Sequence, residues 1–289
     1  MSTLLLNDSY ADPEAGLISS YFCQLFILLN RDSLQYCILE TDKNRFIFLA
    51  DYKLMDSQSG NVKFNEQVEA IISGDKLLQR KYPSVVVGVD SIYHTLVPEA
   101  LYDAGKVSDY LGFNFNLPAD HFCFADYIDE YKAYNLSALP NAVKDMVLNS
   151  YNKAAIVHHS TSILNASYHL SQLPHPSRLF LYIRSKFIDI VLYEENKVLL
   201  YNSFHYINKE DILFYTLYVI EQFSLQPGKV LLCPGGMIEG SSESYQLLAK
   251  YFEHIDFAGR LGVFEYSAVF TRLPSQRYLD LFALALCGS

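Results

Sequence analysis

The sequence predicts an α/β protein built from two similar domains, each with a mixed five-stranded sheet and the element order β-β-β-α-β-α. Three observations lead to this prediction. Three β-rich runs with short polar breaks follow one another near the start of the chain. A helical pattern and a continuous apolar run come next. After a segment with two prolines in the middle of the chain, the same order begins again.

The first copy starts behind residues 1–20, which we expect to form a flexible tail. An antiparallel meander is predicted from the runs CQLFILLN (23–30), SLQYCILE (33–40) and RFIFLADY (45–52). Apolar residues on one face predict a helix over 65–80, with Asn65 as a candidate N-cap. The run SVVVGVD (84–90) is typical of a strand that is buried on both faces.

The middle of the chain completes the first domain. Its patterns predict one or two strands over 121–140, a helix over 141–151, a buried strand over 153–159 and a helix over 160–170 capped by Ser160 or Thr161. The segment SQLPHPS (171–177) is the best candidate for a linker, because two prolines interrupt any regular element there. The predicted division is therefore a first domain at 21–170 and a second at 178–289.

An internal repeat is indicated because residues 178–207 can be laid on residues 24–54. A predicted helix (209–225) and a buried strand (229–234) then follow in the second copy, as they do in the first. Two unrelated meanders could look alike, since strand composition carries little information. The matching order of five elements favours a duplication.

The composition indicates which classes of partner and which cellular compartment to expect. The formal net charge is -10 and no run of Lys and Arg occurs, which argues against a nucleic-acid partner. No segment approaches the roughly 18–20 apolar residues of a membrane span, and the N-terminus does not resemble a signal peptide. The 5 cysteines are scattered without a CxxC pair, as expected of thiols in a reducing compartment. We therefore expect a cytoplasmic protein without membrane insertion.

Three short segments add a family resemblance to this order of elements. LLCPGGM (231–237) resembles the strand and double-glycine turn that touches adenosine in the actin-like ATPases, the ASKHA superfamily with RNase H-like domains. YHTLVPEAL (93–101) and YLDLFALALCGS (278–289) look like segments of its pilus-assembly branch, the PilM and GspL type. From about residue 21 onward, the whole pattern also resembles a bacterial domain-of-unknown-function family with an actin-like ATPase fold.

The resemblance implies that two hairpins, one in each domain, hold the phosphates of ATP. The first should read Asp-x-Gly-Thr/Ser, in which the acid organises Mg²⁺ and the glycine admits the phosphate. Here it reads Asn30-Arg31-Asp32-Ser33, in which neither Asn30 nor any glycine reproduces the pattern, and only a shifted Asp32 or Ser33 could stand in.

The second hairpin should read Asp-x-Gly but reads Arg184-Ser185-Lys186-Phe187. Its acid position carries a base, which could hold an anion but not Mg²⁺ in the way of the family. The pair Gly235-Gly236 does match the adenosine turn. A tight strand-to-helix turn that needs a positive φ is the simpler explanation of this pair.

Other clusters are interpreted as structural. His158 and His159 end a buried strand, where adjacent side chains point to opposite faces, so no metal site is predicted from them. Asp126, Asp129 and Glu130 are expected to be solvated surface. A group of aromatic residues in the second domain fits either core packing or a protein interface. This group consists of Tyr201, Phe204, Tyr206, Phe214, Tyr215 and Tyr218.

These patterns predict a non-catalytic actin-like protein, a scaffold or interaction module with an unidentified protein partner. No catalytic residue is predicted. A vestigial nucleotide cleft would use Gly235, Gly236, Asp32 and Ser33, and bound ATP with Mg²⁺ is not favoured. A divergent ATP-binding protein of the same fold, an ATPase or a small-molecule kinase, is one alternative. A subunit that polymerises as actin does is another, and the oligomeric state is not readable from the sequence.

Overall fold

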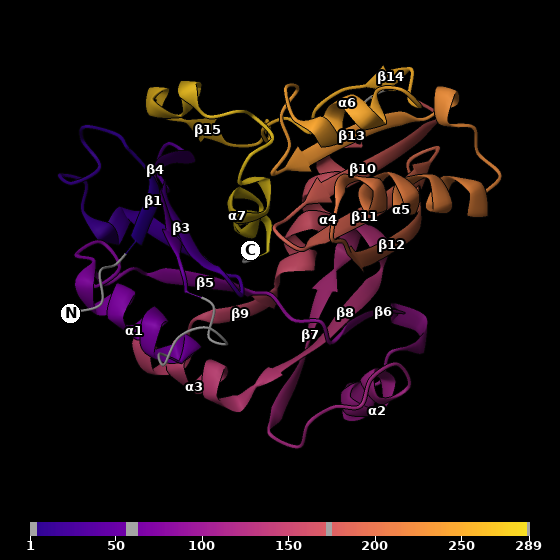
Figure 1. Cartoon of the computed structure of the whole chain (residues 1–289). Coiled ribbons are helices and arrows are strands. Elements are labelled where there is room, and N and C mark those ends of the chain that lie inside the picture. Colours follow the sequence, from indigo (N-terminus) through magenta and orange to yellow (C-terminus); the bar gives the residue numbers. More distant parts are fainter. Residues whose placement is uncertain (1–4, 56–62, 172–174, 288–289) are drawn as a thin grey trace. The chain divides into compact units, whose positions relative to one another are not determined.

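The computed structural model describes residues 5–55, 63–171 and 175–287 (Figure 1). The chain divides into two compact units. The first unit combines the chain up to Ser162 with residues 262–271 and the segment from Leu281 onward, and the second contains residues 163–261 and 272–280. Within the described ranges, no helix is both long enough and apolar enough to cross a membrane.

The main sheet of the first unit has seven strands, in the order β1-β4-β3-β2-β5-β9 with β15 beside β4. The strands are β1 (Leu5–Ala11), β2 (Cys23–Leu29), β3 (Ser33–Glu40), β4 (Arg45–Lys53), β5 (Ser84–Val89), β9 (Ala155–His158) and β15 (Glu265–Tyr266). The predicted antiparallel meander is confirmed as β2-β3-β4. β5 is parallel to β2, and β9 is parallel to β5, so these three strands end at the same edge of the sheet.

This sheet is wider than the five strands predicted from the sequence. Residues 5–11, which were expected to belong to a flexible tail, form β1 and pair with β4. β15 comes from near the end of the chain and pairs with the other end of β4. The side chain of Asn7 donates a hydrogen bond to Asp51 at 3.0 Å, which ties β1 to the meander.

Two helices, α1 (Phe64–Gly74) and α3 (Asn141–Ser150), lie side by side on one face of this sheet (Figure 1). They bury their apolar sides against alternate residues of the strands. The predicted N-cap of α1 was wrong, because Lys63 occupies that position without a side-chain cap. Asn65 lies in the first turn, and its amide donates to the Ala142 carbonyl on α3 at 3.1 Å.

The opposite face of the sheet is covered by the C-terminal segment, which contains α7 (Leu279–Ala283) and a short 3₁₀ helix (Leu284–Leu286). The Phe282 ring lies 4.7 Å from that of Phe46 on β4. Gly88 in β5 leaves room for Leu284, since a Cβ at residue 88 would lie 2.8 Å from it. This packing explains why the end of the chain joins the first unit, which differs from the predicted second domain at 178–289.

A small sheet is inserted between β5 and α3. It has the order β6-β8-β7, with β6 (His94–Pro98), β7 (His121–Ile128) and β8 (Ala133–Pro140), and it packs against α2 (Val107–Gly112). Leu111 and Leu136 are fully buried in its own small core. The prediction of one or two strands over 121–140 is confirmed as β7 and β8.

The sheet of the second unit has five strands, in the order β12-β11-β10-β13-β14. The strands are β10 (Ser177–Ile183), β11 (Phe187–Glu194), β12 (Lys197–His205), β13 (Leu231–Gly236) and β14 (His254–Ile255). α5 (Lys209–Gln222) and α6 (Glu243–Leu248) lie together against one face. The meander β10-β11-β12, the helix α5 and the parallel strand β13 repeat the connectivity of β2-β3-β4, α1 and β5.

Helix starts follow local capping signals in the second unit. Asn208 and Asp211 form a capping box at the start of α5, and Ser242 caps α6.

α4 (His159–Leu170) begins before the predicted caps, so Ser160 lies inside it. The division between the units falls within α4 rather than at the predicted linker 171–177, of which residues 172–174 lie outside the described residues.

Candidate functional site

Three neighbouring strands of the first unit end in polar residues at one edge of the sheet. Asn30 follows β2, Asp90 follows β5, and His158 ends β9. The register aligns Leu29 with Val89, and Val89 with His158. Ligands of open α/β sheets bind beyond the carboxyl ends of parallel strands, so the candidate site of this unit lies at this edge.

The first hairpin tip is held by hydrogen bonds within the turn. The Asn30 N–H donates to the Ser33 carbonyl at 2.9 Å, and the Asn30 amide donates to Ser33 Oγ at 3.1 Å. The Asp32 carbonyl accepts from the N–H of Leu54 at 2.8 Å. Asn30 Oδ1 is buried and has no hydrogen-bond partner among the residues that the structure describes. The predicted residues Asp32 and Ser33 therefore share one turn, in which the Ser33 hydroxyl already accepts from the side-chain amide of Asn30.

The second hairpin carries an ion pair where the resemblance requires an acid. Arg184 Nε donates to Asp189 Oδ2 at 2.8 Å, and Asp189 is fully buried. Tyr201 also donates to this carboxylate, at 3.1 Å. The guanidinium lies over the Phe187 ring, 5.4 Å from its centroid. The charge of Arg184 is thus paired within its own hairpin.

The double glycine is accounted for by packing. Gly236 has a φ of +77°, and a Cβ there would lie 2.2 Å from the Ile183 carbonyl oxygen. A Cβ at Gly235 would lie 2.9 Å from an aromatic ring of β10. The N–H of Gly236 donates to the Gln276 carbonyl (3.0 Å), and that of Met237 to the Ile183 carbonyl (2.8 Å). The turn therefore has the positive φ expected of a tight strand-to-helix turn, and both N–H groups are used within the fold.

A pocket of about 210 Å³ opens beside this turn, and Glu239 and Arg277 are among its lining residues. Ser242, the N-cap of α6, and Pro274 also line it. Sites for whole small molecules usually have about 300–1,000 Å³. The pocket therefore has room for part of a ligand rather than for a complete nucleotide.

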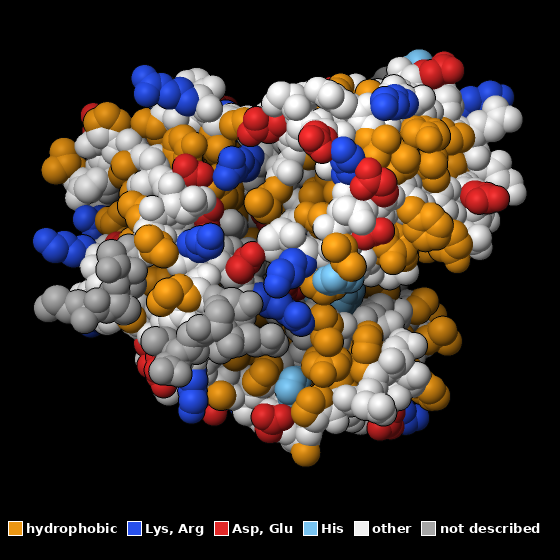
Figure 2. All heavy atoms as spheres, in the orientation of Figure 1, with side chains coloured by type: hydrophobic (Ala, Val, Ile, Leu, Met, Phe, Trp, Pro, Cys, Tyr) orange, Lys and Arg blue, Asp and Glu red, His pale blue; other side chains and the backbone are white. Residues whose placement is uncertain are grey.

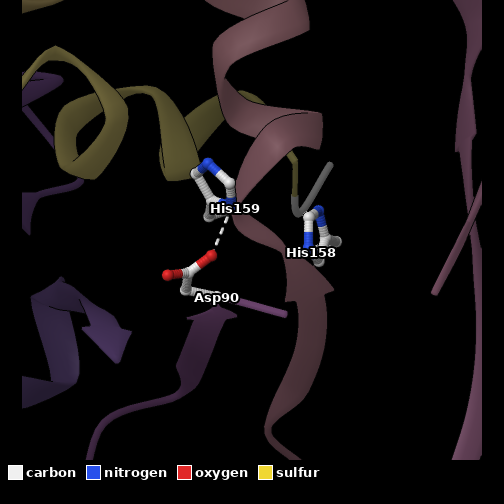
Figure 3. Close-up of side chains that lie close together, drawn as sticks. All are labelled: Asp90, His158 and His159. Atoms are coloured by element: carbon white, nitrogen blue, oxygen red, sulfur yellow. Dashed lines mark ion pairs between the residues drawn. The ribbon is translucent and has the colours of Figure 1, made fainter. Parts of the chain in front are cut away.

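Asp90, His158 and His159 form a cluster at the sheet edge of the first unit (Figure 3). His159 Nδ1 lies 3.6 Å from Asp90 Oδ1, and the two imidazole centroids are 4.9 Å apart. Both histidines are fully buried. The prediction assumed that both histidines end one strand, whereas β9 ends at His158 and α4 begins at His159. Figure 3 shows His159 next to Asp90 and His158 on the other side of the ribbon, and one ligand atom from each of the three residues lies within 4.8 Å of the others.

A buried polar network positions the backbone N–H and the imidazole ring of His158. The Nδ1 atom of His158 lies 2.6 Å from Ser160 Oγ. The Asn135 amide donates to Ser160 Oγ (2.8 Å) and to Thr161 Oγ1 (2.9 Å). Asp126 Oδ2 accepts from the His158 N–H and from Thr161 Oγ1, both at 2.7 Å. Burial raises the pKa of Asp126 to about 7, and the two donors act in the opposite direction.

The predicted acidic surface cluster separates in the structure. Asp129 and Glu130 are exposed, as predicted. Asp126 lies within β7, and its carboxyl is turned into the polar network, so the prediction of a solvated group was wrong for this residue. No local pattern around Asp126 indicates this role, because its hydrogen-bond donors come from β9 and α4.

The family model described as "Protein of unknown function (DUF3822)" matches residues 12–255. The chain belongs to the DUF3822 family. A comparison with curated proteins found no match.

Solved structures show the fold of this DUF3822 protein. It is similar to a protein of Bacteroides thetaiotaomicron with actin-like ATPase fold and unknown function, with a TM-score of 0.77 and 17% identity over 93% of this chain and 97% of that chain. It is also similar to a chain of the PilM-PilN type IV pilus biogenesis complex, with a TM-score of 0.58 and 13% identity over 91% of this chain and 97% of that chain. The protein thus has the α/β, actin-like ATPase fold with two domains that the resemblance implied.

The site residues predicted for the DUF3822 protein fall in both units. Asp32 and Ser33 lie together at the first hairpin tip, and Gly235 and Gly236 end β13 in the second unit. The cluster around Asp90 was not predicted. A usable signal was present, because the buried runs SVVVGVD and KAAIVHH both end in polar residues, and adjacent parallel strands bring such ends together.

Proposed function

We propose that this DUF3822 protein is a non-catalytic actin-like module that acts as a scaffold or protein-interaction partner. The observation that carries this proposal is the pairing of Arg184 with the buried Asp189 at the second hairpin. Phosphoryl transfer depends on a positioned Mg²⁺ and on groups that stabilise charge on the phosphate. A hairpin tip with a base in place of the acid, and with that base already neutralised, supplies neither.

The other two contact points support the same proposal. At the first hairpin, Asn30 replaces the magnesium-organising acid, and Ser33 is bound to it within the turn. At the double-glycine turn, the N–H groups of Gly236 and Met237 are taken by carbonyls of the fold. We infer that the protein keeps a duplicated nucleotide-binding architecture as a structural scaffold and that this architecture has lost its contacts to phosphate.

The helix α5 offers a surface for a protein partner. Phe214 and Tyr218 are 61% and 45% exposed, and their rings stack with centroids 6.1 Å apart. Tyr215, by contrast, stacks on Phe204 at 4.6 Å on the core side of the helix. Figure 2 shows hydrophobic side chains on the surface where α5 lies in Figure 1. Aromatic residues dominate the energetics of protein interfaces, and the similar PilM chain was solved in a complex with PilN.

Nucleotide turnover and binding test the proposal. We expect the purified full-length chain to release no phosphate from ATP with Mg²⁺ above a protein-free blank. Calorimetry at millimolar ATP, with and without Mg²⁺, should show no binding heat. The control variant is Asp42→Ala, which alters an exposed acid elsewhere in the same unit. The proposal is overturned if the wild type shows magnesium-dependent turnover that Asp32→Ala loses and Asp42→Ala keeps.

A divergent ATP-binding protein remains the second candidate, because two observations favour it. Asn30 Oδ1 is a buried acceptor without a partner among the described residues, and the pocket beside Gly236 carries Arg277. This candidate predicts a thermal shift with ATP that Arg277→Ala abolishes. Arg272→Ala, which alters a nearby exposed arginine, should leave that shift unchanged.

A further inference from the structure

We propose that Asp90, His158 and His159 bind a divalent first-row transition metal ion of the zinc class. The proposed metal site uses none of the residues predicted for the nucleotide cleft, and it goes beyond the proposed function. It is assembled by the fold rather than by a sequence motif, since β5 delivers Asp90 and the junction of β9 and α4 delivers both histidines.

The distances fit the ligand set of one ion. A tetrahedral zinc ion with bonds of about 2.0–2.1 Å keeps its ligand atoms about 3.3–3.4 Å apart. His159 Nδ1 and Asp90 Oδ1 are 3.6 Å apart, which is near this separation and longer than a hydrogen bond. Ligand atoms from all three residues lie within 4.8 Å of one another. No pair of these ligand atoms therefore has to approach by more than about 1.5 Å to reach the separation of a tetrahedral shell.

Hydrogen bonds orient the His158 ring through both of its nitrogens. One ring nitrogen lies 2.6 Å from Ser160 Oγ, and the other lies 2.9 Å from the Ser91 carbonyl oxygen. Metal binding exchanges one of these hydrogen bonds for a metal bond, and the other keeps the ring in place. A second hydrogen-bonding group behind each metal-bound imidazole is the usual arrangement in metalloproteins.

The donor set selects the class of metal. Two imidazoles and one carboxylate suit Zn²⁺ and its first-row neighbours, whereas Mg²⁺ and Ca²⁺ prefer shells of oxygen ligands. Three protein ligands leave a fourth position for solvent or for another ligand. Both histidines are fully buried and the Asp90 side chain is only 10% exposed, so the ion would be shielded from bulk water.

Metal titration of the full-length chain, without a histidine tag and stripped with a chelator, tests the proposal. Calorimetry with Zn²⁺ and competition against a chromophoric chelator should show one ion per chain. Asp90→Asn and His159→Gln should each weaken Zn²⁺ binding at least about 100-fold. Substitutions of groups that only hydrogen-bond to a metal ligand already lower metal affinity by about 10–100-fold. His205→Gln, which alters an exposed histidine at the end of β12, is the matched control and should bind like the wild type.

The ligand atoms can also be identified without variants. X-ray absorption at the zinc edge of the loaded wild-type chain should report nitrogen and oxygen ligands with an imidazole pattern and no sulfur. The proposal is overturned if the folded wild-type chain binds no stoichiometric Zn²⁺. It is also overturned if binding survives both substitutions, or if sulfur appears among the ligands.

Discussion

The backbone of Gly236 lies against the carbonyl oxygen of Ile183, so closely that a Cβ atom on residue 236 would stand 2.2 Å from it. The positive φ of Gly236 adds a second penalty for any other residue. We expect Gly236→Ala to lower the free energy of unfolding by about 2 kcal/mol or more, as measured by urea denaturation. Gly240→Ala is the control, since a Cβ there meets nothing within 4 Å. Equal, small effects in both variants would contradict the packing explanation of the turn.

The ion pair of the second hairpin gives a further prediction about stability. Arg184→Met leaves the fully buried Asp189 carboxylate without its guanidinium. Removing one partner of a buried pair costs about 3–5 kcal/mol, and the loss should appear in the free energy of unfolding. Lys186→Met, at an exposed position of the same tip, should change it by less than about 0.5 kcal/mol. Because the uncompensated charge causes the loss, Arg184→Met combined with Asp189→Asn should recover part of it.

Local patterns were enough to predict the meanders but not the full width of the first sheet. β2, β3 and β4 are long, buried runs separated by turn residues, so their signal lies within each strand. β1 is mostly exposed and β15 has two residues, so neither shows a buried alternation. Both strands form because β4 offers a pairing edge, which is a long-range property.

The same limit applies to the candidate sites. The tight turn at Gly236 was predictable, because a double glycine after a strand is a local signal. The approach of His159 to Asp90 depends on the parallel pairing of β5 with β9 and on the residue at which α4 begins. The sequence-based prediction put the helix at 160–170, with Ser160 or Thr161 as its cap, and so left both histidines in the strand.

The carboxyl of Asp126 predicts a pH dependence of stability. Burial raises its pKa to about 7 in the folded chain, above the value of about 3.9 in an unfolded chain. Between these values the folded state binds the extra proton, so the contribution of this group to stability falls as the pH rises from about 4 to about 7. Above that range its contribution is constant.

Asp126→Asn removes this titration and keeps an oxygen for the N–H of His158 and the hydroxyl of Thr161. We therefore expect the free energy of unfolding of the variant, relative to the wild type, to increase across that pH range. Chemical denaturation in buffers from pH 4 to pH 8 measures this difference. A difference that is independent of pH would show that the wild-type carboxyl titrates normally.

Phe282 anchors the end of the chain to the first sheet. Its side chain is 1% exposed and lies 4.7 Å from the ring of Phe46, 5.2 Å from that of Tyr266 and 5.6 Å from that of Phe270. Truncating a buried phenylalanine costs about 3–5 kcal/mol, so Phe282→Ala should lower the free energy of unfolding by that amount in urea. Phe113→Ala, at a side chain that is 85% exposed, should have little effect.

A double-mutant cycle with Phe46→Ala then separates direct ring contact from general loss of the core. Aromatic pairs contribute about 0.5–1.5 kcal/mol beyond the area they bury, so the two substitutions should be coupled by an energy of this size. Strictly additive effects would indicate that residues from Leu281 onward do not pack on β4. The assignment of this segment to the first unit would then fail, and the predicted second domain at 178–289 would be the better division.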